Sequence, residues 1–143
     1  MPKQLLFNTP SIGSWITLGH PAIAEIMAET GFDWLTVDLE HSTITIREAE
    51  DLIRIIELKG VIPLVRLTSN SSDQIKRVMD AGAHGVVVPM VCSGDDARAA
   101  VAAVRYPPVG KRGVGLARAQ GYGSSFETYR SWQANEAIVV VQV

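Results

Sequence analysis

Short apolar runs rich in β-branched residues alternate along the chain with segments in which apolar residues recur at helical spacing. The apolar runs predict strands over residues 12–17, 34–38, 62–67, 85–89 and 137–143. The amphipathic segments predict helices between them, over residues 20–31, 46–58, 71–82 and 93–106. In the second helix Ala49, Leu52, Ile53, Ile56 and Leu58 form an apolar stripe, and polar residues from Ser71 and from Ser93 cap the last two helices. Strands and helices that alternate in this way predict parallel strands joined by right-handed crossovers, and hence an α/β domain.

Two features favour a (β/α)8 TIM-type barrel over an open sheet. No G-x-G-x-x-G motif follows the first predicted strand, and polar residues stand at the C-terminal ends of several strands. These residues are Thr17, Asp38 to His41, Arg66 and Gln142. A complete barrel typically needs about 250 residues. We therefore expect residues 1–143 to form the N-terminal portion of one barrel domain, with only about the first five strands present.

Composition narrows the class of protein without naming a function. The chain is 47% hydrophobic and 20% charged, which is ordinary for a globular domain. A net charge of −2 and the lack of a Lys/Arg-rich run argue against nucleic acid or a membrane surface as the main partner. The N-terminus does not resemble a signal peptide, no run is long enough to span a membrane, and Cys92 is the single cysteine. These observations predict a cytoplasmic protein that binds a small molecule.

The stretch VDLEHS concentrates polarity at the end of the second predicted strand. One interpretation is structural: Asp38 or Ser42 caps the following helix, and His41 is an exposed loop residue. The other interpretation is chemical, because an imidazole beside two carboxylates is suited to general acid–base catalysis near neutral pH. The spacing alone leaves both interpretations open.

Arg66 ends the apolar run IPLVRL, where packing gives little reason for a guanidinium. It either forms a structural ion pair or serves as a fixed cation that binds a carboxylate or stabilises an enolate. The position at the end of a strand favours the second role. Cys92 and His84 carry no such signal, because no base lies near Cys92 and AGAHG is typical of a helix-to-strand turn.

Residues 105–123 form a segment rich in Gly, Pro and Arg that precedes the last predicted strand. It is either a surface crossover that follows the Pro-Pro helix stop, or a binding lid or subunit contact. Loops of this length without regular structure are uncommon in compact domains, which favours the functional alternative.

Four motifs, in this order and spacing, resemble the HpcH/HpaI aldolase family of class II pyruvate aldolases. The motifs are GFDWLTVDLEHS, PLVRL, IKRVMDAGAHGVVVPMV and RYPPVGKRGVG. The family includes 2,4-dihydroxyhept-2-ene-1,7-dioate and 2-dehydro-3-deoxyglucarate aldolases. The resemblance spans essentially the whole chain. It implies a (β/α)8 barrel, a divalent metal such as Mg²⁺, Mn²⁺ or Co²⁺, and retro-aldol cleavage of a 4-hydroxy-2-oxo acid to pyruvate and an aldehyde.

The resemblance also implies roles for particular residues. His41 and Asp38 would form a proton-transfer dyad, and Arg66 would bind the pyruvate oxygens and stabilise the enolate. Glu40 would lie near the water shell of the metal. The residues implied in substrate binding are Arg66, Gln142 and Trp15, the last at the edge of the pocket.

The direct metal ligands of the family, a Glu and an Asp in a Gly-Pro-x-Asp-Leu loop, would fall beyond Val143. We therefore expect little aldolase activity from a 143-residue polypeptide. One alternative is an inactive truncated barrel or an oligomerisation remnant, since family members form homo-oligomers, commonly hexamers or trimers. Another is an enzyme like the citrate lyase β subunit, which acts on acyl-CoA thioesters. The aldehyde substrate is left open.

Overall fold

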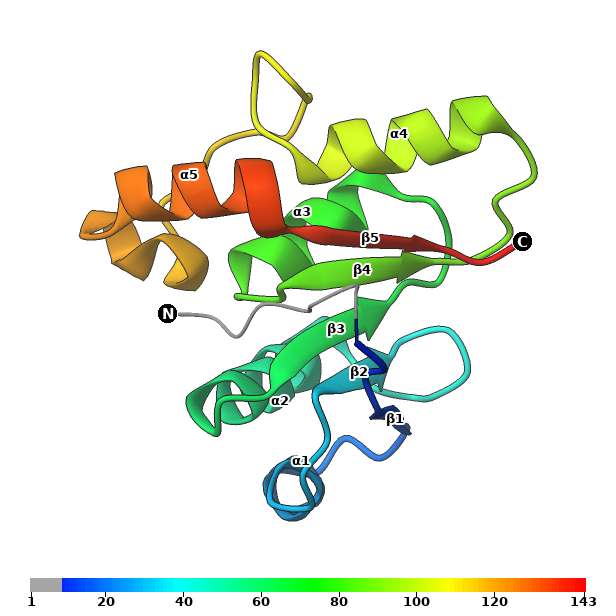
Figure 1. Cartoon of the computed structure of the whole chain (residues 1–143), viewed down its shortest axis with the longest axis vertical. Helices are drawn as coiled ribbons and strands as arrows, with labels where there is room; N and C mark the ends of the chain where they lie inside the picture. The colour runs from blue at the N-terminus through cyan, green and yellow to red at the C-terminus, as the bar shows by residue number, and fades with distance from the viewer. Residues whose placement is uncertain (1–8) are drawn as a thin grey trace.

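The computed structural model describes residues 9–143, which contain one five-stranded parallel sheet in the order β1-β2-β3-β4-β5. The strands are β1 (Gly13–Ile16), β2 (Trp34–Asp38), β3 (Ile62–Arg66), β4 (Gly85–Val88) and β5 (Ile138–Val141). Each strand pairs with the next one in sequence, as the alternating pattern predicts. The C-terminal ends of all five strands therefore meet at one edge of the sheet, and the C-terminus of the chain lies at this edge (Figure 1).

Four helices connect consecutive strands or lead towards them: α1 (Pro21–Ala28), α2 (Ile46–Leu58), α3 (Ser72–Asp80) and α4 (Gly94–Val104). The predicted caps of the last two are confirmed, because the side chains of Ser71 and Ser93 accept hydrogen bonds from backbone N–H groups three residues on. Thr45 and Glu48 form a capping box at the start of α2. Within residues 9–143, no helix is long and apolar enough to cross a membrane.

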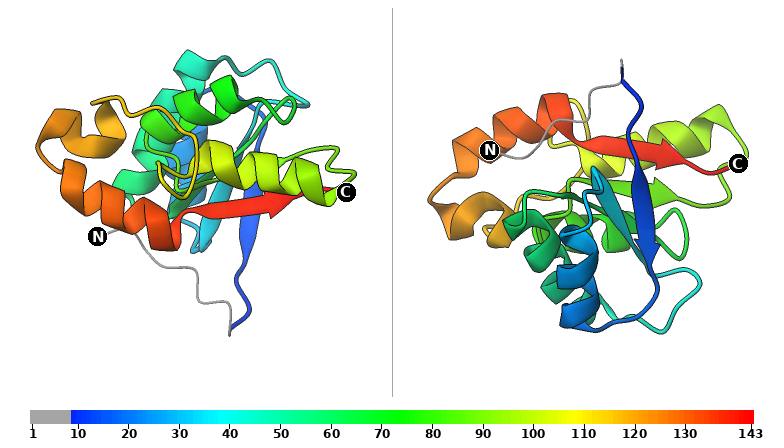
Figure 2. Two further views of the ribbon diagram at one scale, coloured as in Figure 1. Left: turned by 90° about the horizontal axis from the view of Figure 1, so that it is seen from above. Right: turned by 60° about the horizontal axis from the view of Figure 1, so that its bottom comes forward.

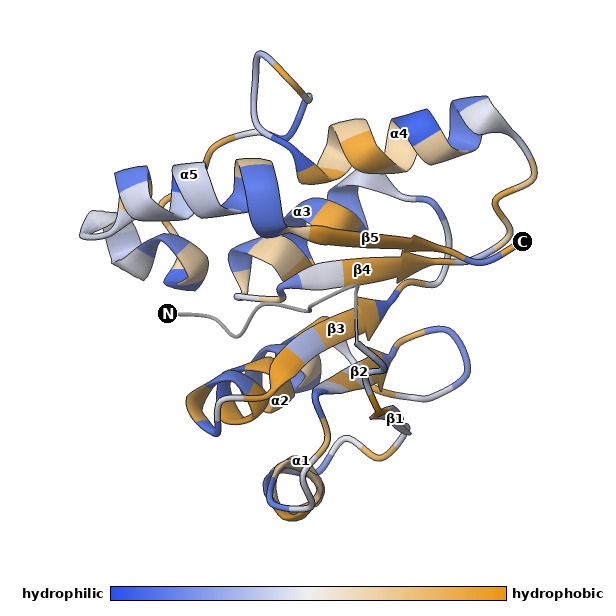
Figure 3. Ribbon diagram, viewed as in Figure 1, coloured by the Kyte–Doolittle hydropathy of each residue, from blue (hydrophilic) through white to orange (hydrophobic). Residues whose placement is uncertain are grey.

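The core lies between the sheet and the helices that cover it. Helix α2 buries Ala49, Leu52, Ile53 and Ile56 completely, as its apolar stripe predicts. Leu58, which was assigned to the same stripe, is 76% exposed, because it occupies the last position of the helix. The strands are apolar along most of their length (Figure 3). Strands β2 to β4 are buried at nearly every position, as expected for parallel strands covered on both faces, whereas the edge strands β1 and β5 are partly exposed.

The segment between α4 and β5 differs from the prediction. Residues 105–123 are predicted as a loop without regular structure, but they contain the 3-10 helix η1 (Arg118–Gly123). The helix α5 (Phe126–Glu136) lies after residue 123, in a stretch for which the sequence predicts no element. Both helices lie at the end of the sheet away from the C-terminus of the chain (Figure 2). Because α4 starts at the C-terminal edge of the sheet and β5 starts at the opposite edge, residues 105–137 belong to the N-terminal edge.

Candidate active site

Asp38 and Arg66 occupy paired register positions at the C-terminal ends of β2 and β3. Nε of Arg66 donates to Oδ1 of Asp38 at 2.9 Å, and Nη2 donates to Oδ2 at 2.6 Å. Asp38 is 1% exposed and the Arg66 side chain is 14% exposed. Two parallel hydrogen bonds set both the position and the plane of a guanidinium. The sheet register and this ion pair therefore hold Arg66 rigidly at the edge where the strands end.

The turn after β2 is built around the Asp38 carboxylate. Oδ1 also accepts hydrogen bonds from the backbone N–H groups of Glu40 (3.0 Å) and His41 (3.2 Å). The Ser42 hydroxyl donates to the Asp38 carbonyl oxygen. An Asp oxygen that accepts from the residue two positions on forms an Asx-turn. Asp38 and Ser42 thus shape this turn, and Thr45 caps α2, which corrects the interpretation that either of them caps that helix.

Hydrogen bonding keeps the Asp38–Arg66 pair ionised. Burial alone would raise the pKa of Asp38, because desolvation disfavours the charged carboxylate. The hydrogen bonds from Arg66 and from the backbone of His41 and Glu40 outweigh burial, and the pKa of Asp38 lies below its usual value. The bond to Asp38 also raises the pKa of Arg66. Asp38 is therefore a weak proton acceptor at neutral pH and serves to anchor Arg66.

The remaining donors of Arg66 face the rest of the site. The Trp15 ring lies against the guanidinium, with its centroid 4.6 Å from Cζ, and Nη1 is 3.4 Å from Oε2 of Glu40. A guanidinium carries five N–H donors, of which Asp38 takes two. The structure thus brings Trp15, Asp38, Glu40 and Arg66 together and leaves donors on Nη1 and Nη2 for an anionic ligand.

His41 adjoins this cluster but points its imidazole elsewhere. Nε2 lies 3.7 Å from Oε2 of Glu40, and the side chain is 71% exposed. The expected dyad would place this imidazole on the Asp38 carboxylate, whereas the structure joins the two residues through the His41 backbone amide. The role of His41 in proton transfer stays a prediction.

Gln142 lies at the same edge, directly after β5. Its backbone N–H donates to the Val88 carbonyl at 2.9 Å, and its carbonyl accepts from the Val91 N–H at 3.0 Å. The residue is exposed. Because β4 separates β3 from β5, Gln142 stands two strands away from Arg66. The structure therefore places the predicted substrate-binding residues on one edge, with Gln142 at its far side.

Glu40 is the group of the site that best fits a cation. Its Oε2 is buried and has no hydrogen-bond donor among the described residues. When ionised, Glu40 and Asp38 each carry a charge of −1 and Arg66 carries +1, so these three groups have a net charge of −1. Hard divalent cations need several oxygen ligands. Residues 9–143 contain no group of three or more His, Cys, Asp or Glu side chains able to hold a metal ion. The described residues thus supply the Glu40 carboxylate, which already lies beside Nη1 of Arg66, and not a complete metal centre.

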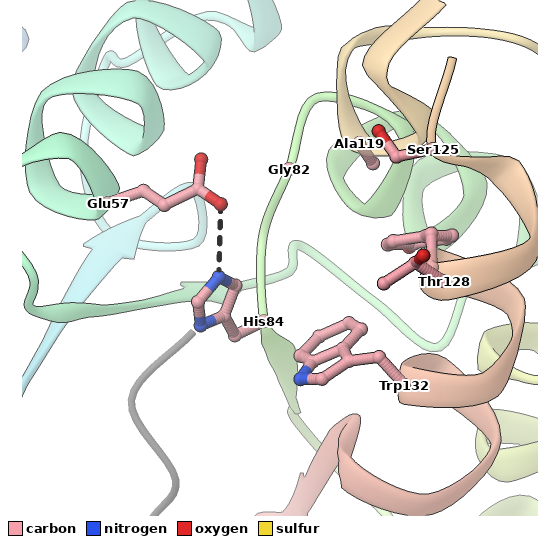
Figure 4. Close-up of a pocket in the computed structure, with 8 residues that line it drawn as sticks. Glu57, Gly82, His84, Ala119, Ser125, Thr128 and Trp132 are labelled. Atoms are coloured by element: carbon pink, nitrogen blue, oxygen red, sulfur yellow. Dashed lines mark hydrogen bonds and ion pairs between the residues drawn. The ribbon is translucent and has the colours of Figure 1, made fainter. Parts of the chain in front are cut away.

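A second polar group lies at the N-terminal edge, around His84. As predicted, His84 belongs to the turn between α3 and β4, but it is also 5% exposed and part of a network. Its Nε2 is 3.3 Å from Oε1 of Glu57, and Nη2 of Arg118 donates to the other oxygen of Glu57. The His84 ring lies 5.1 Å from that of Trp132. Glu57, His84 and Trp132 border a cavity of about 180 Å³ (Figure 4).

The network around Glu57 ties α2, the α3–β4 turn and η1 together. Burial raises the pKa of Glu57, but the hydrogen bonds from His84 and Arg118 outweigh it and leave the pKa below its usual value. The N-terminal face of parallel α/β barrels generally serves stability, whereas catalytic residues lie at the C-terminal face. We therefore assign this network a structural role.

Arg112 anchors the segment 105–123 in the interior. It is 2% exposed, and it donates to the Tyr129 hydroxyl at 2.9 Å and to Oδ1 of Asp80 at 2.5 Å. Gln120 is fully buried and donates to the Tyr106 hydroxyl at 2.7 Å. Because this segment is fixed at the N-terminal edge, it does not cover the Asp38–Arg66 site, and the expectation of a lid is wrong. A role in subunit contact stays a prediction.

Sequence reasoning selected the individual candidate residues but did not predict how they contact one another. The Asp38–Arg66 pair joins residues 28 positions apart and depends on the register of two strands, which no local pattern shows. The Asx-turn had a local signal, since Asp followed by polar residues is typical of such turns. Cys92 is exposed, and its backbone N–H donates to Oδ2 of Asp96.

Comparison with known proteins relates this chain to a known family. The model of the HpcH/HpaI aldolase/citrate lyase family matches residues 11–143. A hydroxypyruvate/pyruvate aldolase of Sagittula stellata is 42% identical over 133 residues, which cover 92% of this chain and 52% of that protein. A 4-hydroxy-2-oxo-heptane-1,7-dioate aldolase of Salmonella heidelberg is 41% identical over 135 residues, or 94% of this chain and 51% of that protein.

Solved structures agree in fold. A HpcH/HpaI aldolase/citrate lyase family protein from Burkholderia cenocepacia J2315 superposes with a TM-score of 0.87 at 34% identity, covering 94% of this chain and 55% of that one. The chain thus spans about half the length of the relatives it matches. The parallel sheet and these neighbours confirm the predicted TIM-barrel-type α/β fold with five strands in this chain. The match over residues 11–143 and the shared fold show that this chain belongs to the HpcH/HpaI aldolase/citrate lyase family.

Proposed function

We propose that the protein is a metal-dependent class II aldolase, a carbon–carbon lyase that reversibly cleaves a 4-hydroxy-2-oxo acid into pyruvate and an aldehyde. The observation that carries this proposal is the anchored guanidinium of Arg66, whose Nη1 and Nη2 keep N–H donors that Asp38 does not take, at the C-terminal edge of the sheet. The names of the relatives support it, because they are aldolases that act on 4-hydroxy-2-oxo-heptane-1,7-dioate and on hydroxypyruvate or pyruvate.

Cleavage of such a substrate makes two demands on the site. A base removes the proton of the 4-hydroxyl group, the C3–C4 bond breaks, the aldehyde leaves, and the bonding electrons remain on pyruvate as an enolate. Protonation of the enolate at C3 then gives pyruvate. The site therefore needs a proton acceptor and a fixed positive charge beside the pyruvate oxygens.

We assign these roles within the cluster at the C-terminal edge. Arg66 donates hydrogen bonds to the oxygens of the 2-oxo acid and stabilises the enolate, and Asp38 holds its guanidinium in place. His41 is the proton-transfer residue, since its imidazole is exposed and lies beside Glu40. Gln142 and Trp15 border the bound pyruvate, and Trp15 additionally covers the guanidinium of Arg66.

The charge balance of the site supports a divalent cation such as Mg²⁺, Mn²⁺ or Co²⁺. Asp38, Glu40 and Arg66 together carry −1 when ionised, so these groups alone would repel an anionic substrate. A bound divalent metal would supply positive charge for the enolate oxygen. Glu40 offers it a buried carboxylate oxygen that accepts no hydrogen bond from the described residues, directly or through water. The other ligands expected from the family resemblance lie outside these 143 residues.

The family resemblance also suggests the domain organisation, assembly and location of the full-length protein. We propose that residues 1–143 correspond to the N-terminal portion of a single barrel domain, in line with their coverage of about half of each relative. We further propose a cytoplasmic homo-oligomer, hexameric or trimeric, whose partners are small 2-oxo acids and aldehydes. Light scattering of the full-length protein tests the assembly, and a monomeric mass would contradict it.

The activity is tested by coupling pyruvate release to lactate dehydrogenase, with the full-length protein and a 4-hydroxy-2-oxo acid. Arg66→Ala is the test variant and Arg98→Ala the control, because the Arg98 side chain is 76% exposed on α4. We expect turnover in the wild type and in the control, and its loss in Arg66→Ala. Cleavage of malyl or citramalyl thioesters with no pyruvate release would instead support an acyl-CoA lyase. No turnover on either class would support an inactive protein.

A further inference from the structure

Met90 combines a strained backbone with an exposed apolar side chain. Its φ is 54°, in the left-handed region, and it is 80% exposed. This conformation is unfavourable for a non-glycine residue, because Cβ comes too close to the following carbonyl oxygen. Residues held in such conformations persist where the surrounding structure enforces them, and they gather at functional sites. Met90 follows β4, so its strain lies at the edge of the sheet that carries the proposed site.

Hydrogen bonds on both sides hold the turn that contains Met90. On one side, the Val91 N–H donates to the Gln142 carbonyl at 3.0 Å, and the Gln142 N–H donates to the Val88 carbonyl at 2.9 Å. On the other side, the Cys92 N–H donates to Oδ2 of Asp96, in the first turn of α4, at 3.2 Å. The turn is thus clamped between the end of β5 and the start of α4.

The position of Met90 relates it to the two proposed pyruvate contacts. Strand β4 lies between β3, which ends with Arg66, and β5, which is followed by Gln142. Val87 of β4 pairs with Arg66, and Met90 comes three residues later, beyond the end of the strand. Arg66 and Gln142 offer hydrogen bonds, whereas Met90 is an exposed apolar residue just beyond the end of the strand that lies between theirs. A substrate held by the two polar residues would carry its other half past this side chain.

We propose that Met90 is a specificity-determining residue that contacts an apolar substituent on the aldehyde half of the substrate. The inference rests on the proposed aldolase function. In the synthetic direction, C3 of the pyruvate enolate bonds to the aldehyde carbon, and the resulting alkoxide takes up a proton. The rest of the aldehyde takes no part in the chemistry and is free to bind elsewhere. An unbranched, polarisable Met side chain adapts to alkyl chains of different shape.

The test compares two aldehydes in pyruvate aldol addition by the full-length protein. Pentanal has an apolar chain, and glycolaldehyde is short and polar. Met90→Gln keeps the unbranched shape and removes the apolar end, while Met90→Leu keeps the apolar character. We expect Met90→Gln to lower kcat/KM for pentanal about 10-fold relative to glycolaldehyde. Met90→Leu is expected to retain the ratio of the wild type within about 2-fold.

Two further variants keep the result interpretable. Leu58→Gln is the matched control, because Leu58 is also exposed and apolar but ends α2 at the opposite edge of the sheet. Met90→Gly accepts the left-handed backbone without strain and is expected to fold and to show the selectivity loss of Met90→Gln. An equal loss for both aldehydes, or an unchanged ratio in an active enzyme, would overturn the inference and leave the aldolase function standing. A wild type inactive on both aldehydes would overturn the two together.

Discussion

Removal of the Arg112 guanidinium is expected to destabilise the protein far more than removal of an exposed one. Arg112 has no exposed side-chain surface, and its Nη2 lies 2.5 Å from Oδ1 of Asp80. On α4, Nη2 of Arg98 lies 2.6 Å from Oδ1 of Asp95, but these side chains are 76% and 89% exposed. The two ion pairs have nearly the same length and differ in burial, which makes them a matched test.

The magnitude follows from what each substitution leaves behind. Removing one partner of a buried ion pair costs about 3–5 kcal/mol, because the other charge stays buried and unpaired. Asp80 is 21% exposed and regains part of its hydration. The Tyr129 hydroxyl loses a donor as well. We therefore expect Arg112→Ala to lower the free energy of unfolding by about 3–4 kcal/mol. The exposed pair of Arg98 contributes less than about 1 kcal/mol.

Urea-induced unfolding, followed by circular dichroism, measures both changes. The double variant Arg112→Met/Asp80→Asn removes both charges and keeps most of the buried volume, so it is expected to lose less stability than Arg112→Ala. If Arg112→Ala and Arg98→Ala lost the same amount, the buried network would not be what holds residues 105–123 in place.

Three more outcomes follow from the structure. Burial raises the pKa of Tyr129 to about 12, so the folded state keeps the hydroxyl proton at pH values above the ordinary tyrosine pKa of about 10, where the unfolded chain loses it. The free energy of unfolding is therefore expected to fall by about 1–3 kcal/mol between pH 10 and 12. A decline of equal size in Tyr129→Phe would show that Tyr129 is not its cause. In the full-length protein, His41→Ala and Arg66→Ala should each reduce pyruvate-releasing turnover by about 10² or more, and unchanged turnover would remove that residue from the site. Treatment with EDTA should abolish the same turnover and Mg²⁺, Mn²⁺ or Co²⁺ should restore it, whereas full activity in EDTA would contradict metal dependence.

Local patterns were sufficient for most of the fold. Ser71 and Ser93 were recognised as caps, because a capping side chain acts within three residues of its own position. Strands β2 to β4 begin where the apolar runs predict. Helix α5 was not predicted, because it buries only Tyr129 and the polar Gln133 and therefore has no apolar stripe. Its position depends on partners such as Arg112, which no periodicity within the helix reveals.

The candidate site was predicted residue by residue and not as a network. The ends of the strands placed Asp38, Arg66 and Gln142 on one edge, which the parallel sheet confirms. The partner of the Asp38 carboxylate could not be deduced, because His41 is near in sequence while Arg66 is near only in the folded sheet. Proximity in sequence favoured the His41 imidazole as the partner of the Asp38 carboxylate. The register of β2 and β3 places the Arg66 guanidinium there instead.

Enolate formation beside Arg66 is tested most directly by exchange of the pyruvate methyl protons with deuterium in D₂O. Proton NMR follows this exchange with the full-length protein, a divalent metal and pyruvate, and it requires no aldehyde. A pyruvate aldolase with this site should accelerate exchange over buffer, and Arg66→Ala should slow it by about 10² or more while Arg98→Ala leaves it unchanged. Exchange at the buffer rate in the wild type, or equal exchange in Arg66→Ala, would contradict the assignment.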